Sequence, residues 1–229
     1  NVQAKMLAEV AVNKKIKTMA VVYEKSNKIY GEEFYRFFAE KYLKMGGKII
    51  FIRSFISGPQ SDVFKIAKAA AASNPQGILM LADGIDTAIF MQKLSHLKPD
   101  VLVLTGSWCM TNDFIQYGGD SLSRMIIASD YSVDDKSNHD LVSFKEKYKK
   151  RFGVNPTFSS SNSYDAVLII FLMLKTNPHA NSEYLRQFLR ENKIFHGVQG
   201  EITINDSGDM ERKQYLYQVQ GDVFQKIEK

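Results

Sequence analysis

The chain has 229 residues, of which 45% are hydrophobic and 24% are charged. This length suits one large domain or two small ones, and the apolar share is sufficient for a packed core. The net charge is +5, but the lysines are spread along the chain, and we find neither a helix-turn-helix nor a zinc finger. A nucleic-acid partner is therefore not expected, and the basic group at residues 147–151 is better explained as a solvated helix face.

The single cysteine, Cys109, excludes an internal disulfide framework and a cysteine-rich metal site. No apolar run reaches the roughly 20 residues that a membrane-spanning helix needs, and no signal peptide is recognised. Asn1 is not an initiator methionine, which is typical of a processed or truncated product.

The first half of the chain repeats a strand–loop–helix pattern. Short apolar runs alternate with helix-period runs, which predicts βαβ units and a buried parallel sheet. A helix over residues 2–12 is expected to precede it. The predicted strands are 16–23, 48–55, 77–82, 101–105 and 124–129, and the predicted helices are 31–46, 62–73, 85–96 and 112–118. Gly31 is expected to open the first of these helices, and Ser61 and Asn112 are expected to cap two others.

The pattern changes after Tyr131. Residues 132–138 are polar and predict a linker between lobes. Within the helices that follow, residues 166–174 are nearly all apolar and are expected to be deeply buried. The predicted helices are 139–152, 160–175 and 182–191, and the predicted strands are 201–204, 214–220 and 223–227, the last two forming a hairpin.

Several segments occur together in an order and spacing known from one protein family. They are IKTMAVVYEKSNKIYGEEF, GGKII, GPQSDVFKIAKAAAASNPQGILML, NDFIQYGGDSLSRMIIAS, FKEKYKKRFGVNPTF, SYDAV and GVQGEITINDSGDM. The whole chain thereby resembles the branched-chain amino acid (Leu/Ile/Val)-binding family, the type I periplasmic solute-binding proteins of ABC importers. The resemblance implies an α/β fold: a parallel-sheet, three-layer lobe plus the helical return segment of an incomplete first lobe.

The resemblance also implies a division into lobes. Residues 14–131 and 214–229 correspond to the second ligand-binding lobe, and residues 1–13 and 135–204 to a remnant of the first. The chain looks like roughly the C-terminal two-thirds of a family member. We expect another segment, or a homodimer of the isolated chain, to cover the apolar face that the incomplete first lobe leaves. Half of the ligand site would also be absent, so binding is expected to be weak or absent unless the rest is supplied.

The function that the resemblance implies is binding of a small organic solute, either amino acid-like or an aromatic or carboxylate compound. Two lobes close over the ligand, and an ABC transporter permease receives it. The expected location is the periplasm or another extracytoplasmic place, including the cell surface as a lipoprotein, and no cofactor is implied. An alternative is an extracellular sensing domain of a receptor or histidine kinase, which a following transmembrane helix would indicate. A LacI-type regulator is a third alternative, but it requires an N-terminal helix-turn-helix.

Candidate ligand-binding residues follow from the resemblance and from the rule that ligands bind at the carboxyl ends of parallel strands. Tyr30 either lines the cleft or covers the start of a helix. Asp83 either pairs with a ligand ammonium or caps the following helix, and capping is slightly favoured. Asn162, with the serines before it, either contacts the ligand or caps a helix. The full set is Tyr30, Asp83, Gly84, Ser107, Trp108, Tyr131 and Asn162.

Trp108 departs from the family pattern. It stands where amino-acid binders of the family usually carry an acidic residue for the α-ammonium group. A neutral indole cannot neutralise a cation, although it can stack on one or on an aromatic ring. The departure favours an aromatic or carboxylate ligand, unless Trp108 only fills the lobe surface.

No catalytic motif accompanies these residues. The four histidines are scattered outside any ligand spacing such as H-E-x-x-H, and neither G-x-S-x-G nor a P-loop occurs. Cys109 follows a strand, but no histidine is placed to activate it, so a buried and inert thiol is expected. The sequence therefore predicts neither an enzyme nor a metal site.

Overall fold

The computed structural model describes residues 2–59 and 61–228, apart from the side chain of Ile29. The chain divides into two compact units. The larger unit comprises Asn1–Ser129 and Gln214–Lys229, and the smaller unit comprises Asp130–Lys213. Within the described residues, no helix is both long and apolar enough to cross a membrane.

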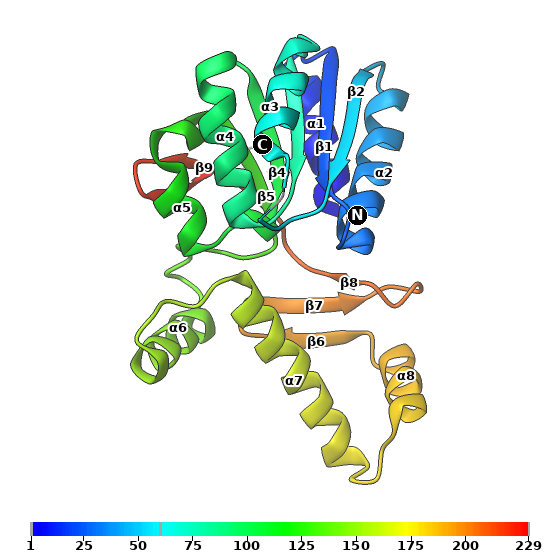
Figure 1. The fold of residues 1–229 in the computed structure, drawn as a ribbon. Coiled ribbons are helices and arrows are strands. Elements are labelled where there is room, and N and C mark those ends of the chain that lie inside the picture. The colour runs from blue at the N-terminus through cyan, green and yellow to red at the C-terminus, as the bar shows by residue number, and fades with distance from the viewer. Residues whose placement is uncertain (1, 60, 229) are drawn as a thin grey trace. The chain divides into compact units, whose positions relative to one another are not determined.

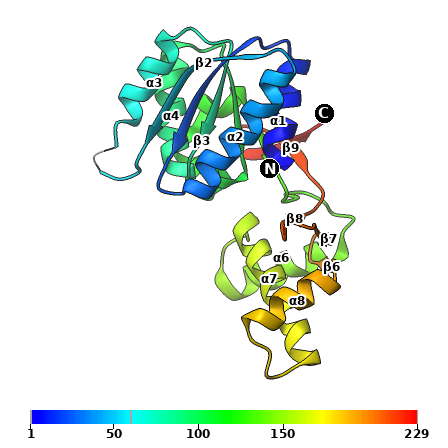
Figure 2. The same ribbon diagram turned by 90° about the vertical axis from the view of Figure 1, so that its right-hand side faces the viewer.

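The larger unit is a seven-stranded sheet between two layers of helices (Figures 1 and 2). Its strands are β1 (Thr18–Glu24), β2 (Lys48–Phe55), β3 (Gly77–Leu81), β4 (Leu102–Gly106), β5 (Met125–Ser129), β9 (Tyr215–Gln220) and β10 (Val223–Ile227). Their order is β10-β9-β5-β4-β3-β1-β2, with β1 to β5 parallel and β9 and β10 antiparallel. The predicted parallel sheet and terminal hairpin are therefore confirmed.

Helices cover both faces of this sheet (Figure 2). Helices α1 (Val2–Asn13) and α2 (Lys28–Lys44) share a core with the sheet. The opposite layer consists of α3 (Val63–Ala72), α4 (Gly84–Leu97) and α5 (Asn112–Gly118), with the 3-10 turns η1 (Ser107–Cys109) and η2 (Gly119–Arg124). Because both faces are covered, β3 and β5 are buried at every residue, and their sequences are nearly continuous apolar runs.

Helix α1 belongs to the larger unit. Its residues Met6, Leu7 and Val10 are buried in the same core as Phe34 and Phe38 of α2. This packing differs from the expected grouping of residues 1–13 with the first-lobe remnant. The reason is that the apolar side of α1 lies against α2 and the sheet, a contact across the chain that the helix period alone does not specify.

Three helix starts differ from the predictions. Helix α2 begins at Lys28, three residues before Gly31, because the side chain of Asn27 accepts a hydrogen bond from the Tyr30 N–H at 3.3 Å. Helix α5 is capped by Thr111, whose side chain accepts from the Phe114 N–H, and not by Asn112. The N-cap position of α3 is held by Asp62, without a capping side-chain hydrogen bond, so Ser61 does not have the predicted role.

The smaller unit combines three helices with a small antiparallel sheet (Figure 1). They are α6 (His139–Phe152), α7 (Phe158–Thr176), α8 (Ser182–Glu191), β6 (Ile194–Gly197), β7 (Gly200–Ile204) and β8 (Met210–Glu211). The three helices were predicted, whereas β6 and β8 were not. Their hydrophobic residues form two small clusters, one around Leu141 and Phe144 and one around Ile169 and Phe195.

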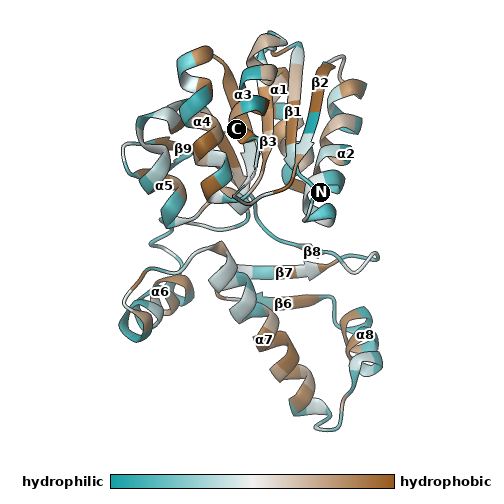
Figure 3. Ribbon diagram, in the orientation of Figure 1, coloured by the Kyte–Doolittle hydropathy of each residue, from teal (hydrophilic) through white to brown (hydrophobic). Residues whose placement is uncertain are grey.

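The expectation that residues 166–174 are deeply buried is wrong. Only one stripe of α7 is covered, through Ser161, Asp165, Ile169 and Met173. Figure 3 shows that the helix is hydrophobic over much of its length. Its exposed apolar side chains include Val167 at 64%, Ile170 at 41%, Phe171 at 54%, Leu172 at 37% and Leu174 at 37%. Its covered stripe packs on the β6–β7 face with Phe195 and Ile202, and Tyr164 near its start meets Phe144 of α6, whereas the exposed apolar side chains are left open by the residues that the structure describes.

Candidate ligand-binding site

The predicted site residues of the larger unit lie where strands end. Tyr30 is in the first turn of α2, which follows β1, and Ser107 and Trp108 form η1 directly after β4. Asp83 is the N-cap residue of α4, which follows β3, and Gly84 is the first residue of this helix. Since β1, β3 and β4 are neighbours in a parallel register, their carboxyl ends lie along one edge of the sheet.

An aromatic cluster forms at this edge. The rings of Tyr30 and Trp108 meet edge-to-face, with centroids 5.0 Å apart, and the ring centroids of Tyr30 and Phe34 are 5.4 Å apart. Gly106 makes the approach feasible, because a Cβ there would lie 2.2 Å from the Tyr30 hydroxyl oxygen. Trp108 is half-buried, so part of the indole remains available for stacking on a ring or a cation.

A polar pair adjoins the rings. The Ser107 N–H donates to Gln3 Oε1 at 3.3 Å, and Gln3 Nε2 donates to Ser107 Oγ at 3.3 Å. The Tyr30 hydroxyl lies 3.5 Å from the backbone nitrogen of Trp108. Gln3 was not predicted as a site residue, although one signal was present: it stands four residues before the fully buried Leu7, on the inner side of α1.

The structure gives Asp83 and Gly84 a local structural explanation. The Asp83 side chain caps α4 by accepting from the Asp86 N–H at 2.9 Å, which is the alternative that the sequence favoured. A Cβ on Gly84 would lie 2.1 Å from Thr111 Oγ1, so this glycine permits close packing of α4 on the α5 start. Tyr30, Ser107 and Trp108 are thus brought together, whereas Asp83 and Gly84 organise a neighbouring helix end.

Buried carboxylates tie the strand-end loops together. Glu24 is 2% exposed and accepts from the N–H groups of Ser26 at 2.8 Å and Asn27 at 3.0 Å. Burial raises the pKa of Glu24, but these backbone hydrogen bonds outweigh it and leave the pKa lowered. Asp86 accepts from Ser57 Oγ. Its pKa is raised, first by burial and then by the nearby charges of Asp83 and Glu24.

Tyr131 and Asn162 belong to the smaller unit. The Tyr131 hydroxyl donates to the Pro156 carbonyl at 3.2 Å, and the ring lies 5.3 Å from the Lys145 ammonium. Asn162 uses both ends of its amide, donating to Asp130 and accepting from Arg212. The serines next to Asn162 lie inside the first turns of α7, where Ser160 forms a capping box with Thr157. These contacts give both residues an internal structural role.

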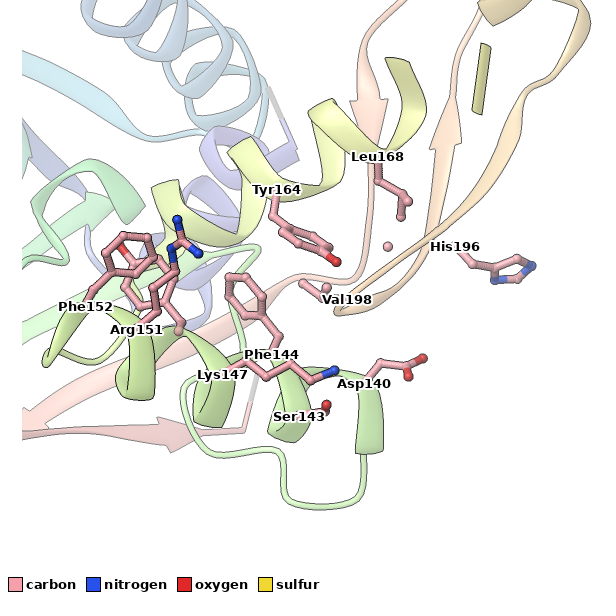
Figure 4. A pocket seen from close by; sticks show the side chains of 12 residues that line it. Asp140, Ser143, Phe144, Lys147, Arg151, Phe152, Tyr164, Leu168, His196 and Val198 are labelled. Carbon is pink, nitrogen blue, oxygen red and sulfur yellow. The ribbon is translucent and has the colours of Figure 1, made fainter. Parts of the chain in front are cut away.

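A separate groove of about 480 Å³ lies in the smaller unit between α6, α7 and β6 (Figure 4). Its lining includes the rings of Phe144 and Tyr164, which are tilted with centroids 5.1 Å apart, and the cationic side chains of Lys147 and Arg151. None of the predicted site residues lines it. Tyr164 and Leu168 connect the groove to the exposed side of α7.

Cys109 has the environment expected for an inert thiol. It is fully buried, and burial raises its pKa to about 12. The thiolate, which is the nucleophilic form, is therefore strongly disfavoured near neutral pH. Among the described residues, no group of three or more His, Cys, Asp or Glu side chains is arranged to hold a metal ion.

The sequence matches the family described as periplasmic binding protein over residues 1–223. The chain belongs to this periplasmic binding protein family. The resemblance inferred from the ordered sequence segments is thereby confirmed, and so is the predicted type I fold. No curated protein matches the sequence.

Solved structures of the family share the fold. The leucine-binding protein LivK of Thermotoga maritima matches with a TM-score of 0.87 and 22% identity, over 99% of this chain and 64% of that chain. LivJ of Streptococcus pneumoniae, solved with isoleucine, matches with a TM-score of 0.81 and 16% identity, over 97% of this chain and 62% of that chain. An ABC-transporter solute-binding protein of Rhodopseudomonas palustris, solved with 3,4-dihydroxybenzoic acid, matches with a TM-score of 0.81 and 21% identity. This match covers 95% of this chain and 60% of that chain. The chain spans less than two-thirds of the length of each of these proteins.

Proposed function

We propose that the chain is the solute-binding part of an extracytoplasmic receptor that delivers a small organic molecule to an ABC importer. The observation that carries the proposal is the aromatic and hydroxyl cluster of Tyr30, Ser107 and Trp108 at the sheet edge of a periplasmic binding protein fold. Binding is reversible and non-covalent, two lobes close over the solute, and a permease reads the closed form. The protein performs no catalysis, which agrees with the buried Cys109 thiol.

The chemistry of the cluster favours an aromatic or carboxylate solute over an α-amino acid. Trp108 and Tyr30 offer ring surfaces, and Ser107 and Gln3 offer hydrogen-bonding groups. The nearby carboxylate of Asp83 caps a helix, and that of Glu24 accepts backbone N–H groups. An α-ammonium group would therefore compete with existing hydrogen bonds, whereas a planar ring would use the half-buried indole.

A sensing role is the second candidate. Two similar structures from Rhodopseudomonas palustris are described as extracellular ligand-binding receptors, with TM-scores of 0.82 and 0.81 at 21% and 16% identity. The same closure would then be read by a receptor or kinase domain. Either role places the protein outside the cytoplasm, in the periplasm or at the cell surface.

We further propose that the larger unit is the second lobe of the receptor and that the smaller unit is a remnant of the first. The open sides of α7 support this assignment, because an apolar helix of this kind normally packs into a layered core. A sheet of the same protein would cover this face in the functional receptor, and a second copy would cover it in the isolated chain. Light scattering tests the second part, since a strictly monomeric chain at high concentration would contradict homodimer formation.

The solute proposal can be tested with the single tryptophan of the chain, Trp108. Benzoate, dihydroxybenzoate, leucine and isoleucine are titrated while Trp108 emission and heat release are recorded. We expect the aromatic acids to change both signals more than the amino acids. Trp108→Ala should abolish the heat, whereas Tyr117→Ala, which removes an aromatic side chain that is 51% exposed, should leave it unchanged. Preferential binding of leucine or isoleucine would contradict the proposed solute class.

A further inference from the structure

The smaller unit contains a buried ion pair that the proposed binding site does not use. Arg212 Nη1 donates to Asp165 Oδ2 at 3.1 Å and to Asn162 Oδ1 at 3.0 Å. Arg212 Nε also lies 3.9 Å from Asp130 Oδ2. The exposed fractions of the side chains are 5% for Arg212, 0% for Asp165 and 18% for Asp130. We refer to Asp130, Asn162, Asp165 and Arg212 as the clasp.

Further hydrogen bonds fix the geometry of the clasp. Asn162 Nδ2 donates to Asp130 Oδ2 at 3.3 Å, and the Val198 N–H donates to Asp165 Oδ1 at 2.8 Å. Gly197 leaves space for the Asp165 carboxylate, since a Cβ there would lie 2.5 Å from Oδ2. Burying these charges is unfavourable unless each finds partners, and such groups are attested as devices that select one arrangement.

The residues of the clasp lie close to the two points where the chain enters and leaves the smaller unit. Asp130 is the first residue of the smaller unit, and Arg212 is the last but one. The chain therefore enters and leaves this unit at two residues that contact each other, and the start of α7 contacts both. Hinges in closing proteins are a few residues at the ends of elements that absorb the backbone rotation.

We propose that the clasp holds the two chain crossings at a fixed spacing, so that the closing movement is confined to the bonds around Ser129–Asp130 and Lys213–Gln214. Asn162 is then a positioning residue that acts through Asp130 and Arg212 rather than a ligand contact. The inference rests on the proposed function for the existence of a closing movement. Its test needs no solute, so the two can fail separately.

The test measures the distance distribution between the two units. Spin labels are attached at Lys68→Cys in the larger unit and Lys150→Cys in the smaller unit, both exposed positions, and pulsed electron paramagnetic resonance records the distribution. The native Cys109 is fully buried with its pKa raised to about 12, so it does not compete for the label. Arg212→Met removes the positive charge and the hydrogen-bond donors of the guanidinium group. Arg212→Lys keeps the positive charge but not the planar guanidinium group. Arg186→Met, in an exposed ion pair with Glu183, is the matched control.

We expect Arg212→Met to broaden the distribution, Arg212→Lys to broaden it less, and Arg186→Met to leave it unchanged. Hydrogen exchange should show lost protection at the Val198 amide, while the Ile169 amide of α7 stays protected. A distribution of unchanged width together with an exposed Val198 amide would overturn the proposal, because the clasp would then serve packing alone. If Arg212→Met does not fold, the same criterion is applied to Arg212→Lys. If Arg212→Met broadens the distribution but the parent chain binds no solute, the proposal for the clasp stands and the proposed function fails.

Discussion

The larger and smaller units cover the large apolar side chains of their helices to very different extents. In the larger unit Phe38 of α2 is 0% exposed, because α2 packs on α1 and on the sheet. In the smaller unit Phe171 of α7 is 54% exposed, because the covered residues of α7 lie along one stripe through Ser161, Asp165, Ile169 and Met173. An apolar helix sequence thus shows that a helix requires cover, whereas the layers around it decide whether its own unit supplies that cover.

The two units also differ in how far each is expected to be stable by itself. The larger unit has strands buried on both faces and helices on each side, so it meets the layered architecture of an independent domain. The smaller unit relies on two small clusters and on the clasp. We therefore expect substitutions at equivalent residue types to differ in effect between the units.

The largest expected effect is in the larger unit. Phe38→Ala should lower the free energy of unfolding by about 3–5 kcal/mol, because it removes a fully buried ring from a packed core. Urea unfolding followed by Trp108 emission measures this, since the only tryptophan lies in the same unit. Phe171→Ala is the matched control, and a loss comparable to that of Phe38→Ala would mean that α7 is covered in solution.

A smaller effect is expected at the covered stripe of α7. Ile169 is 6% exposed, so Ile169→Ala should destabilise the smaller unit by about 2–4 kcal/mol. Val167 lies on the open side at 64% exposure, and Val167→Ala should have an effect within about 0.5 kcal/mol. Hydrogen exchange at α7 amides reports on this unit separately, with the Trp108 transition unchanged. Equal effects of the two substitutions would contradict the single-stripe packing.

The same contrast explains how far the sequence could predict the structure. Strand and helix periods up to Tyr131 are local, so the parallel sheet and the order of its elements could be read directly. The proximity of Tyr30, Ser107 and Trp108 followed from a general rule about strand ends. The exposure of α7 does not follow from these periods, because it depends on which layers are present around the helix. It was expected only from the resemblance, which implied an incomplete first lobe with an uncovered apolar face.

Long-range polar contacts were the main omissions. Gln3 bonds to Ser107 across 104 positions, and Arg212 bonds to Asn162 across 50 positions. Neither pair has a spacing signal, since the fold brings the partners together only after the sheet and the helices have formed. Strands β6 and β8 have four and two residues and were missed because such short runs carry no clear alternation.

Removing the N-cap of α5 should change the free energy of unfolding of the larger unit by about 1 kcal/mol. Thr111 accepts from the Phe114 N–H at 3.2 Å, so Thr111→Ala should remove this cap and lower stability by roughly 1 kcal/mol. Asn112→Ala alters the adjacent residue, which the sequence had indicated as the cap, and should change stability little. The Trp108 unfolding midpoint distinguishes the two. A greater loss of stability for Asn112→Ala would identify Asn112 as the cap, as the sequence predicted.

The smallest effect concerns the charge of Asp86. Its pKa lies above the ordinary value of 3.8, chiefly because of burial, so its contribution to stability is full below that value and is lost as pH rises through the raised pKa. Glu24 has the opposite sign: its lowered pKa gives stability above the ordinary value of 4.5, which is lost as pH falls. Asp86→Asn retains an oxygen that can accept from Ser57 Oγ and removes the repulsion from Asp83 and Glu24. The variant should therefore gain stability over the parent chain at pH 7, and the gain should disappear in acid.

Melting curves of the two chains across this pH range measure the difference. Asp62→Asn is the control, since Asp62 is an exposed carboxylate in a surface ion pair with Lys65 and should give no such rise with pH. A gain for Asp86→Asn that is the same at every pH would show that the substitution acts by packing or hydrogen bonding and not through the carboxylate charge. A gain confined to neutral pH would identify Asp86 as an unfavourable buried charge in the larger unit.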